Sequence, residues 1–168
     1  STSWGFSIAS STLVGQALGA GEEGEATAYG TQIITLAAVV HLFVAAGVIL
    51  LAKPIATIFV ADPAAIALSA TFIAVSAVSL VALGVDGSAT GALRGAGDTR
   101  IPFYASLVGL YIFTLPVAYL GTVTALGEAA LYVALVLETG VPAAVTLRRF
   151  RTGKWRAVSR DYRPEAEP

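Results

Sequence analysis

The sequence predicts an all-α fold: a polytopic integral membrane helix bundle with about five transmembrane helices. Of its 168 residues, 56% are hydrophobic and only 12% are charged, whereas a typical soluble domain has about 25% charged residues. The charges are also unevenly placed, because ten of the 21 lie after Leu147. The chain before that point is a series of long uncharged windows separated by short polar turns. A window of roughly 20 apolar residues is long enough to cross a bilayer.

Five such windows predict spans at about 1–18, 28–51, 64–92, 101–121 and 128–147, which together form a transmembrane lobe over residues 1–147. The first window is rich in Ser and Thr, so we expect this helix to pack against other helices rather than face lipid. Gly15 and Gly19 support this expectation, because small residues four apart let two helix backbones approach closely.

The other four windows are more apolar. Counting His and the charged residue types, the second contains only His41 and the third only Asp86. The fifth has Glu128 at its first position and Glu138 in its interior, while the fourth contains none. Pro116 and Pro142 lie inside the last two spans. Each removes one backbone hydrogen bond, which predicts a kink at that point.

The basic residues predict the orientation in the membrane. Alternating spans place the loop near residues 19–26, the turn near 91–102 and the tail at 148–168 on one side, with Lys53 alone on the other. Nine of the ten basic residues then share one side: Arg94, Arg100, Arg148, Arg149, Arg151, Lys154, Arg156, Arg160 and Arg163. Such an excess marks the cytoplasmic side. Topology therefore explains the basic cytoplasmic tail without a nucleic-acid partner.

Three short motifs carry a resemblance to a known family. Residues 91–102 (GALRGAGDTRIP) resemble the loop between helices ten and eleven of the multidrug and toxic compound extrusion (MATE) family. Residues 14–21 (VGQALGAG) resemble the element that closes helix eight of that family, and residues 150–155 (FRTGKW) resemble its usual ending. The three motifs occur in the family's order, at spacings that fit helices nine to twelve between them.

This resemblance implies twelve helices in two six-helix lobes, of which the chain would hold a partial second lobe. The chain has no methionine, so we interpret it as a fragment that lacks the first lobe and helix seven. The implied activity is secondary active efflux, in which Na⁺ or H⁺ is the coupling ion for export of amphipathic organic or toxic compounds by alternating access. The expected location is the cell membrane, and no other cofactor is expected. The expected partners are membrane lipid, a drug-like small molecule and the missing N-terminal lobe.

The turn at 91–102, which begins with Gly91, also has a local physical interpretation. Arg94 meets the negative end of the preceding helix dipole, and Pro102 suits the first turn of the next helix. Asp98 or Thr99 can cap that helix. The two remaining glycines of the motif permit left-handed backbone; they are Gly95 and Gly97. We predict a structural loop, a rigid corner about which a lobe can rock.

Asp86 is the first candidate for binding a coupling cation or a cationic substrate. It belongs to a helical stripe in which polar and large apolar residues recur every three or four positions: Ser69, Phe72, Ser76, Ser79, Leu83, Asp86 and Thr90. One interpretation is a wall of a water-filled cavity, and the other is close packing of small polar residues. Family members that use an acidic residue on this helix have it about one turn earlier, near Leu83 or Gly84 here.

Glu138 and His41 are the other ionisable candidates within the spans. Glu138 lies near the middle of its window, where a charge is costly enough to indicate a function, although a protonated structural glutamate is the alternative. His41 is either a neutral histidine bonded to a facing helix or a proton relay.

Several other classes are disfavoured. The chain has one His and no Cys, so no metal site is expected, and a phosphate-binding Gly-Lys-Ser/Thr loop is missing. A flippase for lipid-linked precursors remains open, but its cavity should contain more Arg and Lys. An intramembrane enzyme that uses Asp86, His41 and Glu138 and a purely structural membrane subunit also remain open.

Overall fold

The computed structural model describes residues 2–161, which form helices joined by short turns and contain no strand. Two helices begin the chain, α1 (Thr2–Gly19) and α2 (Glu23–Phe59), and α3 (Pro63–Gly95) follows. The next span consists of α4 (Arg100–Val108), the π-helical segment η1 (Gly109–Thr114) and α5 (Leu115–Val123). The helices α6 (Gly127–Arg151) and α7 (Trp155–Asp161) end the described part. The all-α membrane fold is thus confirmed.

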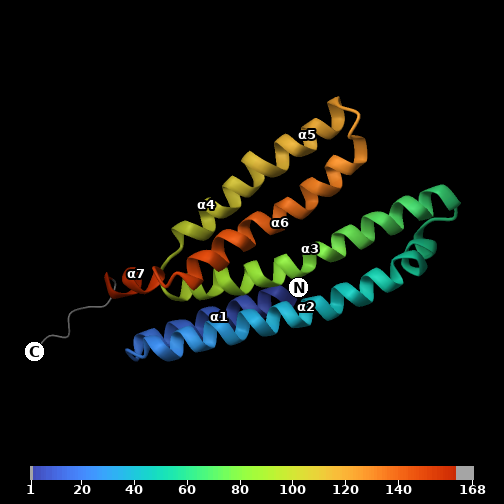
Figure 1. The fold of residues 1–168 in the computed structure, drawn as a ribbon. Helices are drawn as coiled ribbons and strands as arrows, with labels where there is room; N and C mark the ends of the chain where they lie inside the picture. The colour runs from blue at the N-terminus through green and yellow to red at the C-terminus, as the bar shows by residue number, and fades with distance from the viewer. Residues whose placement is uncertain (1, 162–168) are drawn as a thin grey trace, which may run out of the picture.

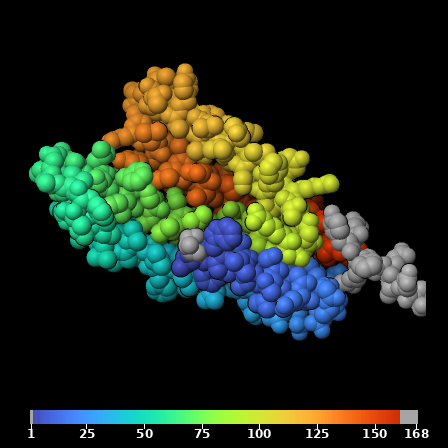
Figure 2. Space-filling model, turned by 180° about the vertical axis from the view of Figure 1, so that it is seen from behind, coloured from blue at the N-terminus to red at the C-terminus, as the bar shows by residue number. Residues whose placement is uncertain are grey.

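Helix α3 is the centre of the bundle. It packs against α1, α2 and α6, whereas α4, η1 and α5 rest on α6. In Figure 1 the α5–α6 end diverges from the α2–α3 end, so the bundle has the outline of a V. Seen from behind in Figure 2, α1 lies at the surface beside α3. Side chains on α3 can therefore share a site with side chains of α1, α2 or α6.

Four helices within residues 2–161 are long and apolar enough to cross a membrane, and they are α2, α3, the continuous helix Arg100–Val123, and α6. The predicted first span is not among them. Its helix α1 does form, but its Ser and Thr residues make it too polar for this group. It packs on α2 and α3 instead. Of the predicted pair of small residues, Gly15 lies against α3, because an added Cβ would be 3.3 Å from the Gly95 carbonyl oxygen, whereas nothing lies within 4 Å of a Cβ added to Gly19.

The helices are longer than the sequence suggested. The predicted span 28–51 is part of the 37-residue helix α2, which continues through Pro54 to Phe59. At 1.5 Å per residue α2 is roughly 55 Å long, so it exceeds the ~30 Å hydrocarbon layer. The π-helical segment η1 lies just before Pro116, where the sequence predicts a kink.

Contact between α1 and α3 depends on glycine. A Cβ atom added to Gly87 would lie 3.3 Å from the carbonyl oxygen of Ser3, and one added to Gly91 or Gly95 would overlap the carbonyl of Ser7 or Ser11. These glycines recur every four residues on one face of α3. The missing side chains therefore allow the two backbones to touch along three helical turns.

The predicted tail at 148–168 begins inside α6, and its described part is folded. Trp155 is fully buried, its ring is stacked on Phe150 at a centroid distance of 5.4 Å, and its Nε1–H donates to the Phe150 carbonyl at 2.9 Å. Arg160 pairs with Glu23 of α2 at 2.8 Å. The pKa of Arg160 is raised, chiefly by its hydrogen bond to Glu23. Helix α7 thus fastens the end of α6 to the start of α2.

The basic residues gather at one end of the bundle, which we call the basic end. It comprises the turns at 20–22 and 96–99 and the segment 148–161, which lie together in Figure 1, while Lys53 lies toward the opposite end of α2. Arg163 lies outside the described residues. The other eight residues of the predicted basic group lie in or beside these segments.

Candidate functional site

Asp86 lies on α3 where that helix faces α6. Its Oδ1 accepts a hydrogen bond from the Thr146 hydroxyl of α6 at 2.9 Å. A longer contact of 3.5 Å comes from the Thr90 hydroxyl, one turn later on α3. The side chain of Asp86 is half-buried. The carboxylate is thus held by hydroxyl donors and remains open on one side.

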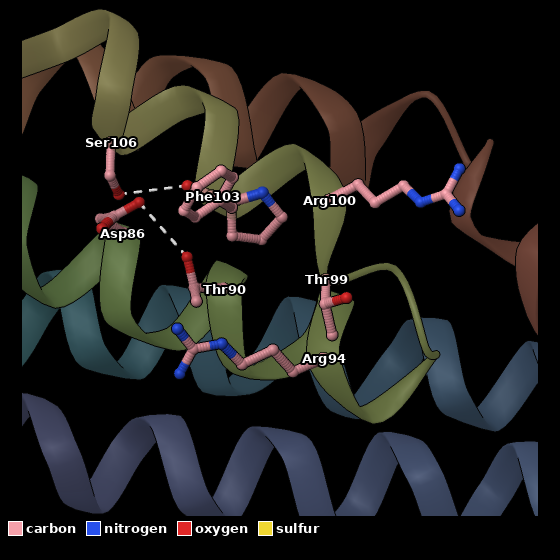
Figure 3. A pocket seen from close by; sticks show the side chains of 8 residues that line it. Asp86, Thr90, Arg94, Thr99, Arg100, Phe103 and Ser106 are labelled. Atoms are coloured by element: carbon pink, nitrogen blue, oxygen red, sulfur yellow. Dashed lines mark hydrogen bonds between the residues drawn. The ribbon is translucent and has the colours of Figure 1, made fainter.

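Three cavities meet at Asp86. The largest, of about 630 Å³, separates α3 from α4, and Figure 3 shows Asp86 at one end of it and the 96–99 turn at the other. A second, of about 470 Å³, lies between α1 and α3 and is lined by Ser3, Ser7 and Ser11. A third, of about 280 Å³, lies between α3, α6 and the α4–η1 span. A cation that enters any of these cavities meets the same carboxylate.

Glu138 lines the third cavity together with Asp86. Thr139 lines it as well, and its Oγ1 atom is buried without a hydrogen-bond partner. The hydroxyl of Ser106 belongs to the same cavity wall. The structure therefore brings two carboxylates and two hydroxyls around one space, all of them oxygen ligands of the kind that hard cations prefer.

Ser79 takes part in helix packing in this structure, whereas the Ser76 hydroxyl bonds within its own helix. Ser79 is buried, and its hydroxyl donates across to the Leu135 carbonyl of α6 at 3.4 Å. The Ser76 hydroxyl donates to the Phe72 carbonyl of its own helix at 2.8 Å. The predicted polar stripe thus divides. Its end near Asp86 borders three cavities and its other end, Ser69 and Phe72, borders a separate one of about 400 Å³, while Ser79 between them joins α3 to α6.

His41 lines none of the three cavities at Asp86. It is 2% exposed, and its Nε2 lies 2.9 Å from the Ser3 hydroxyl. Its Nδ1 lies 2.8 Å from the Ala37 carbonyl, which can only accept, so this nitrogen carries the proton. The ring packs where Gly84 of α3 leaves room, since a Cβ there would overlap it. His41 of α2 thus joins α1 and α3 at one point of the bundle.

The prediction that residues 91–102 form a loop is wrong in its extent. Helix α3 continues to Gly95, so Gly91 and Arg94 are helical and the turn is only residues 96–99. Its backbone closes through hydrogen bonds from the Asp98 and Gly97 amides to the Leu93 and Arg94 carbonyls, at 2.8 and 3.0 Å. These bonds satisfy the carbonyls that a helix end leaves unpaired.

Two residue roles in this turn also differ from the prediction. Gly97 has a positive φ of 82°, but Gly95 is helical and serves the α1 contact instead. Asp98 does not cap α4. It is 4% exposed and accepts from the Arg149 Nε of α6 at 2.7 Å, while Thr99 occupies the cap position without a side-chain bond. Pro102 lies in the first turn of α4, as expected.

Sequence reasoning missed Thr146, Thr139, Ser106 and Arg149. A signal for Thr146 was present, because Glu138, Pro142 and Thr146 recur every four residues on one face of α6. The other three gave no such signal. Within residues 2–161, no group of three or more His, Cys, Asp or Glu side chains could hold a metal ion.

The sequence profile of the family described as MatE matches residues 1–120, more than two thirds of the chain. This chain belongs to the MatE family. The family resemblance expected from the three motifs is therefore confirmed, and so is a multi-pass membrane protein.

The chain is also similar in sequence to individual proteins named as multidrug resistance or extrusion proteins. The chain is 27% identical over 153 residues to a probable multidrug resistance protein NorM of Thermotoga maritima, covering 90% of this chain and 33% of the relative. It is 32% identical to a protein of the same name from Rhodopseudomonas palustris, covering 87% and 32%. It is 33% identical to human multidrug and toxin extrusion protein 1, covering 80% and 24%. The chain thus spans about a third or less of these relatives. No solved structure matches it.

Proposed function

We propose that this chain is part of a secondary active exporter of the cell membrane, which exchanges Na⁺ or H⁺ for amphipathic organic or toxic compounds by alternating access. The names of the MatE relatives, which refer to multidrug resistance and toxin extrusion, support the substrate class. The observation that carries the proposal is the position of Asp86, one carboxylate shared by three cavities. An antiporter needs such a group because ion and substrate must compete for a common state.

In this proposal Asp86 binds the coupling cation, and Glu138 assists from the opposite wall of the third cavity. The hydroxyls of Thr146 and Thr90 hold the Asp86 carboxylate in place through the bonds described above. The groove between α1 and α3 gives the substrate access to the same carboxylate. The remaining wall belongs to the missing N-terminal lobe, so we expect the 168-residue chain alone not to transport.

The basic end is cytoplasmic in this proposal, according to the positive-inside rule. Thr57 lies near the opposite end of α2 and is exposed. A Thr57→Cys variant of the full-length protein should react with a membrane-impermeant thiol reagent from outside the cell. Reaction from the cytoplasm alone would reverse the proposed orientation.

Two alternatives fit the geometry less well. A flippase for anionic lipid-linked precursors needs a basic cavity, but the three cavities at Asp86 are lined by only two basic residues, Arg94 and Arg100, both at the basic end. An intramembrane enzyme would need His41 beside the carboxylates, whereas His41 is bonded to Ser3 and Ala37. We therefore propose transport rather than catalysis.

The deciding experiment uses full-length protein in liposomes at matched expression. Asp86→Asn preserves the shape of the side chain but removes its charge, so drug efflux should lose its dependence on the Na⁺ or pH gradient. Glu138→Gln should weaken this dependence. Asp62→Asn is the matched control, because Asp62 is an exposed helix cap of the same helix α3 that accepts from the Ala65 amide. Wild-type efflux in both Asp86→Asn and Glu138→Gln would assign the coupling site to the other lobe.

A further inference from the structure

The cavity between α3 and α4 joins Asp86 to the basic end of the bundle. Its lining includes Thr90 and Arg94 of α3, Thr99 of the turn, and Arg100 and Ser106 of α4. Most of the side chains in this wall are polar. Figure 3 shows the hydroxyls of Ser106 and Thr90 beside the Asp86 carboxylate, with Thr99 nearer the turn. A polar wall inside a helix bundle is typical of a water-filled space.

The packing explains why this space exists. Helix α4 rests on α6 and leaves the adjacent face of α3 uncovered. The turn that joins α3 to α4 is held in place from α6, through the buried ion pair between Asp98 and Arg149. The mouth of the cavity is therefore a fixed structure rather than a loose loop.

The two arginines of this cavity point in different directions. In Figure 3 the guanidinium of Arg94 extends along the cavity toward Thr90 and Asp86, whereas that of Arg100 extends away from them. Arg94 forms no ion pair with Asp86 in this structure, although both line the same two cavities. A positive charge in this position stabilises an ionised carboxylate whose cation has left.

We infer that the cavity between α3 and α4 is the passage through which the coupling cation leaves Asp86 toward the basic end, with Arg94 as the charge that replaces the cation. This inference rests on the proposed function and adds a route and a residue to it. The substrate uses the groove between α1 and α3, so ion and substrate approach the shared carboxylate from different sides. A carboxylate paired with Arg94 also rebinds a cation less readily.

Accessibility to a thiol reagent tests the passage. In full-length protein freed of other cysteines, Ser106→Cys lines the cavity, whereas Leu107→Cys, the next residue on α4, does not. A membrane-impermeant, positively charged methanethiosulfonate reagent should modify Ser106→Cys from the basic-end side at least tenfold faster than from the other side. Leu107→Cys should remain slow from both sides. Equal rates for the two variants, with both proteins folded and transporting, would overturn the passage.

Charge variants test Arg94. Arg94→Gln should slow gradient-driven efflux several-fold, because the cation is then released without a replacement charge. Arg94→Lys should restore most of the rate. Arg151→Gln is the control, since Arg151 is an exposed arginine of the same basic end that lines none of the three cavities at Asp86. Equal rates in Arg94→Gln and Arg151→Gln would remove Arg94 from the inference. The thiol test measures access to Ser106 and does not depend on the charge of Asp86. The passage can therefore fail in that test while the Asp86→Asn experiment still supports the coupling site, and the reverse.

Discussion

Replacing Gly91 by Ala should disrupt the contact between α1 and α3. The added Cβ would overlap the backbone carbonyl oxygen of Ser7. Because the obstacle is main chain, no rotamer change can relieve it, and α1 must shift as a whole. That shift would also disturb the contacts of Gly87 and Gly95 with the same face of α1.

The expected magnitude follows from two opposing terms. Inserting a methyl group into a closely packed site costs about 1–3 kcal/mol. Replacing a helical glycine by alanine returns roughly 0.5–1 kcal/mol through reduced backbone entropy of the unfolded chain. The net loss in free energy of unfolding should therefore be about 0–2.5 kcal/mol.

The assay is an SDS titration of the full-length protein followed by circular dichroism. Gly47→Ala is the matched control, because Gly47 is also a helical glycine but nothing lies within 4 Å of an added Cβ. It should be neutral or slightly stabilising. Adding Ser7→Gly to Gly91→Ala should not restore stability, since the carbonyl stays in place. If Gly91→Ala is as stable as Gly47→Ala, the close backbone contact does not exist and the reasoning is refuted.

Two further predictions concern the basic end and use the same unfolding measurement. Arg149→Met leaves the buried Asp98 carboxylate unpaired and should cost about 3–5 kcal/mol, whereas Arg160→Met, which breaks an exposed pair, should change stability little. A small effect at Arg149 would mean that Asp98 is solvated. Trp155→Ala removes a fully buried ring and should cost about 3–5 kcal/mol, whereas Trp4→Ala should cost much less, because Trp4 is 72% exposed. Equal losses for the two tryptophans would contradict the docking of α7.

The sequence alone determined the class of protein and the existence of its helices. Long uncharged windows are local properties, and a backbone in a bilayer must bond within its own segment, so such windows become helices wherever they pack. Helix ends were less well determined. The sequence placed the end of the second span at residue 51, but α2 continues through Pro54. A proline removes only one hydrogen bond, so it does not by itself end a helix.

The tertiary structure alone decided which candidates share a site. Asp86 and Glu138 are 52 positions apart, and they line one cavity because α3 and α6 cross near both. His41 also lies near the middle of its predicted span, yet it packs against Gly84 and does not line that cavity. The pattern of one helix shows which residues share a face, but the facing helix is chosen by long-range packing.

The same limit explains the errors in the 91–102 motif. The sequence indicated that Gly91 and Gly95 were special and assigned them to a loop, because glycine favours turns when only local backbone freedom is considered. In the structure they are helical, and their value is the absence of a side chain facing α1. Likewise Asp98, a plausible cap by position, pairs with Arg149, 51 residues away. Local chemistry determined that these residues matter, and the packing of distant helices determined what each one does.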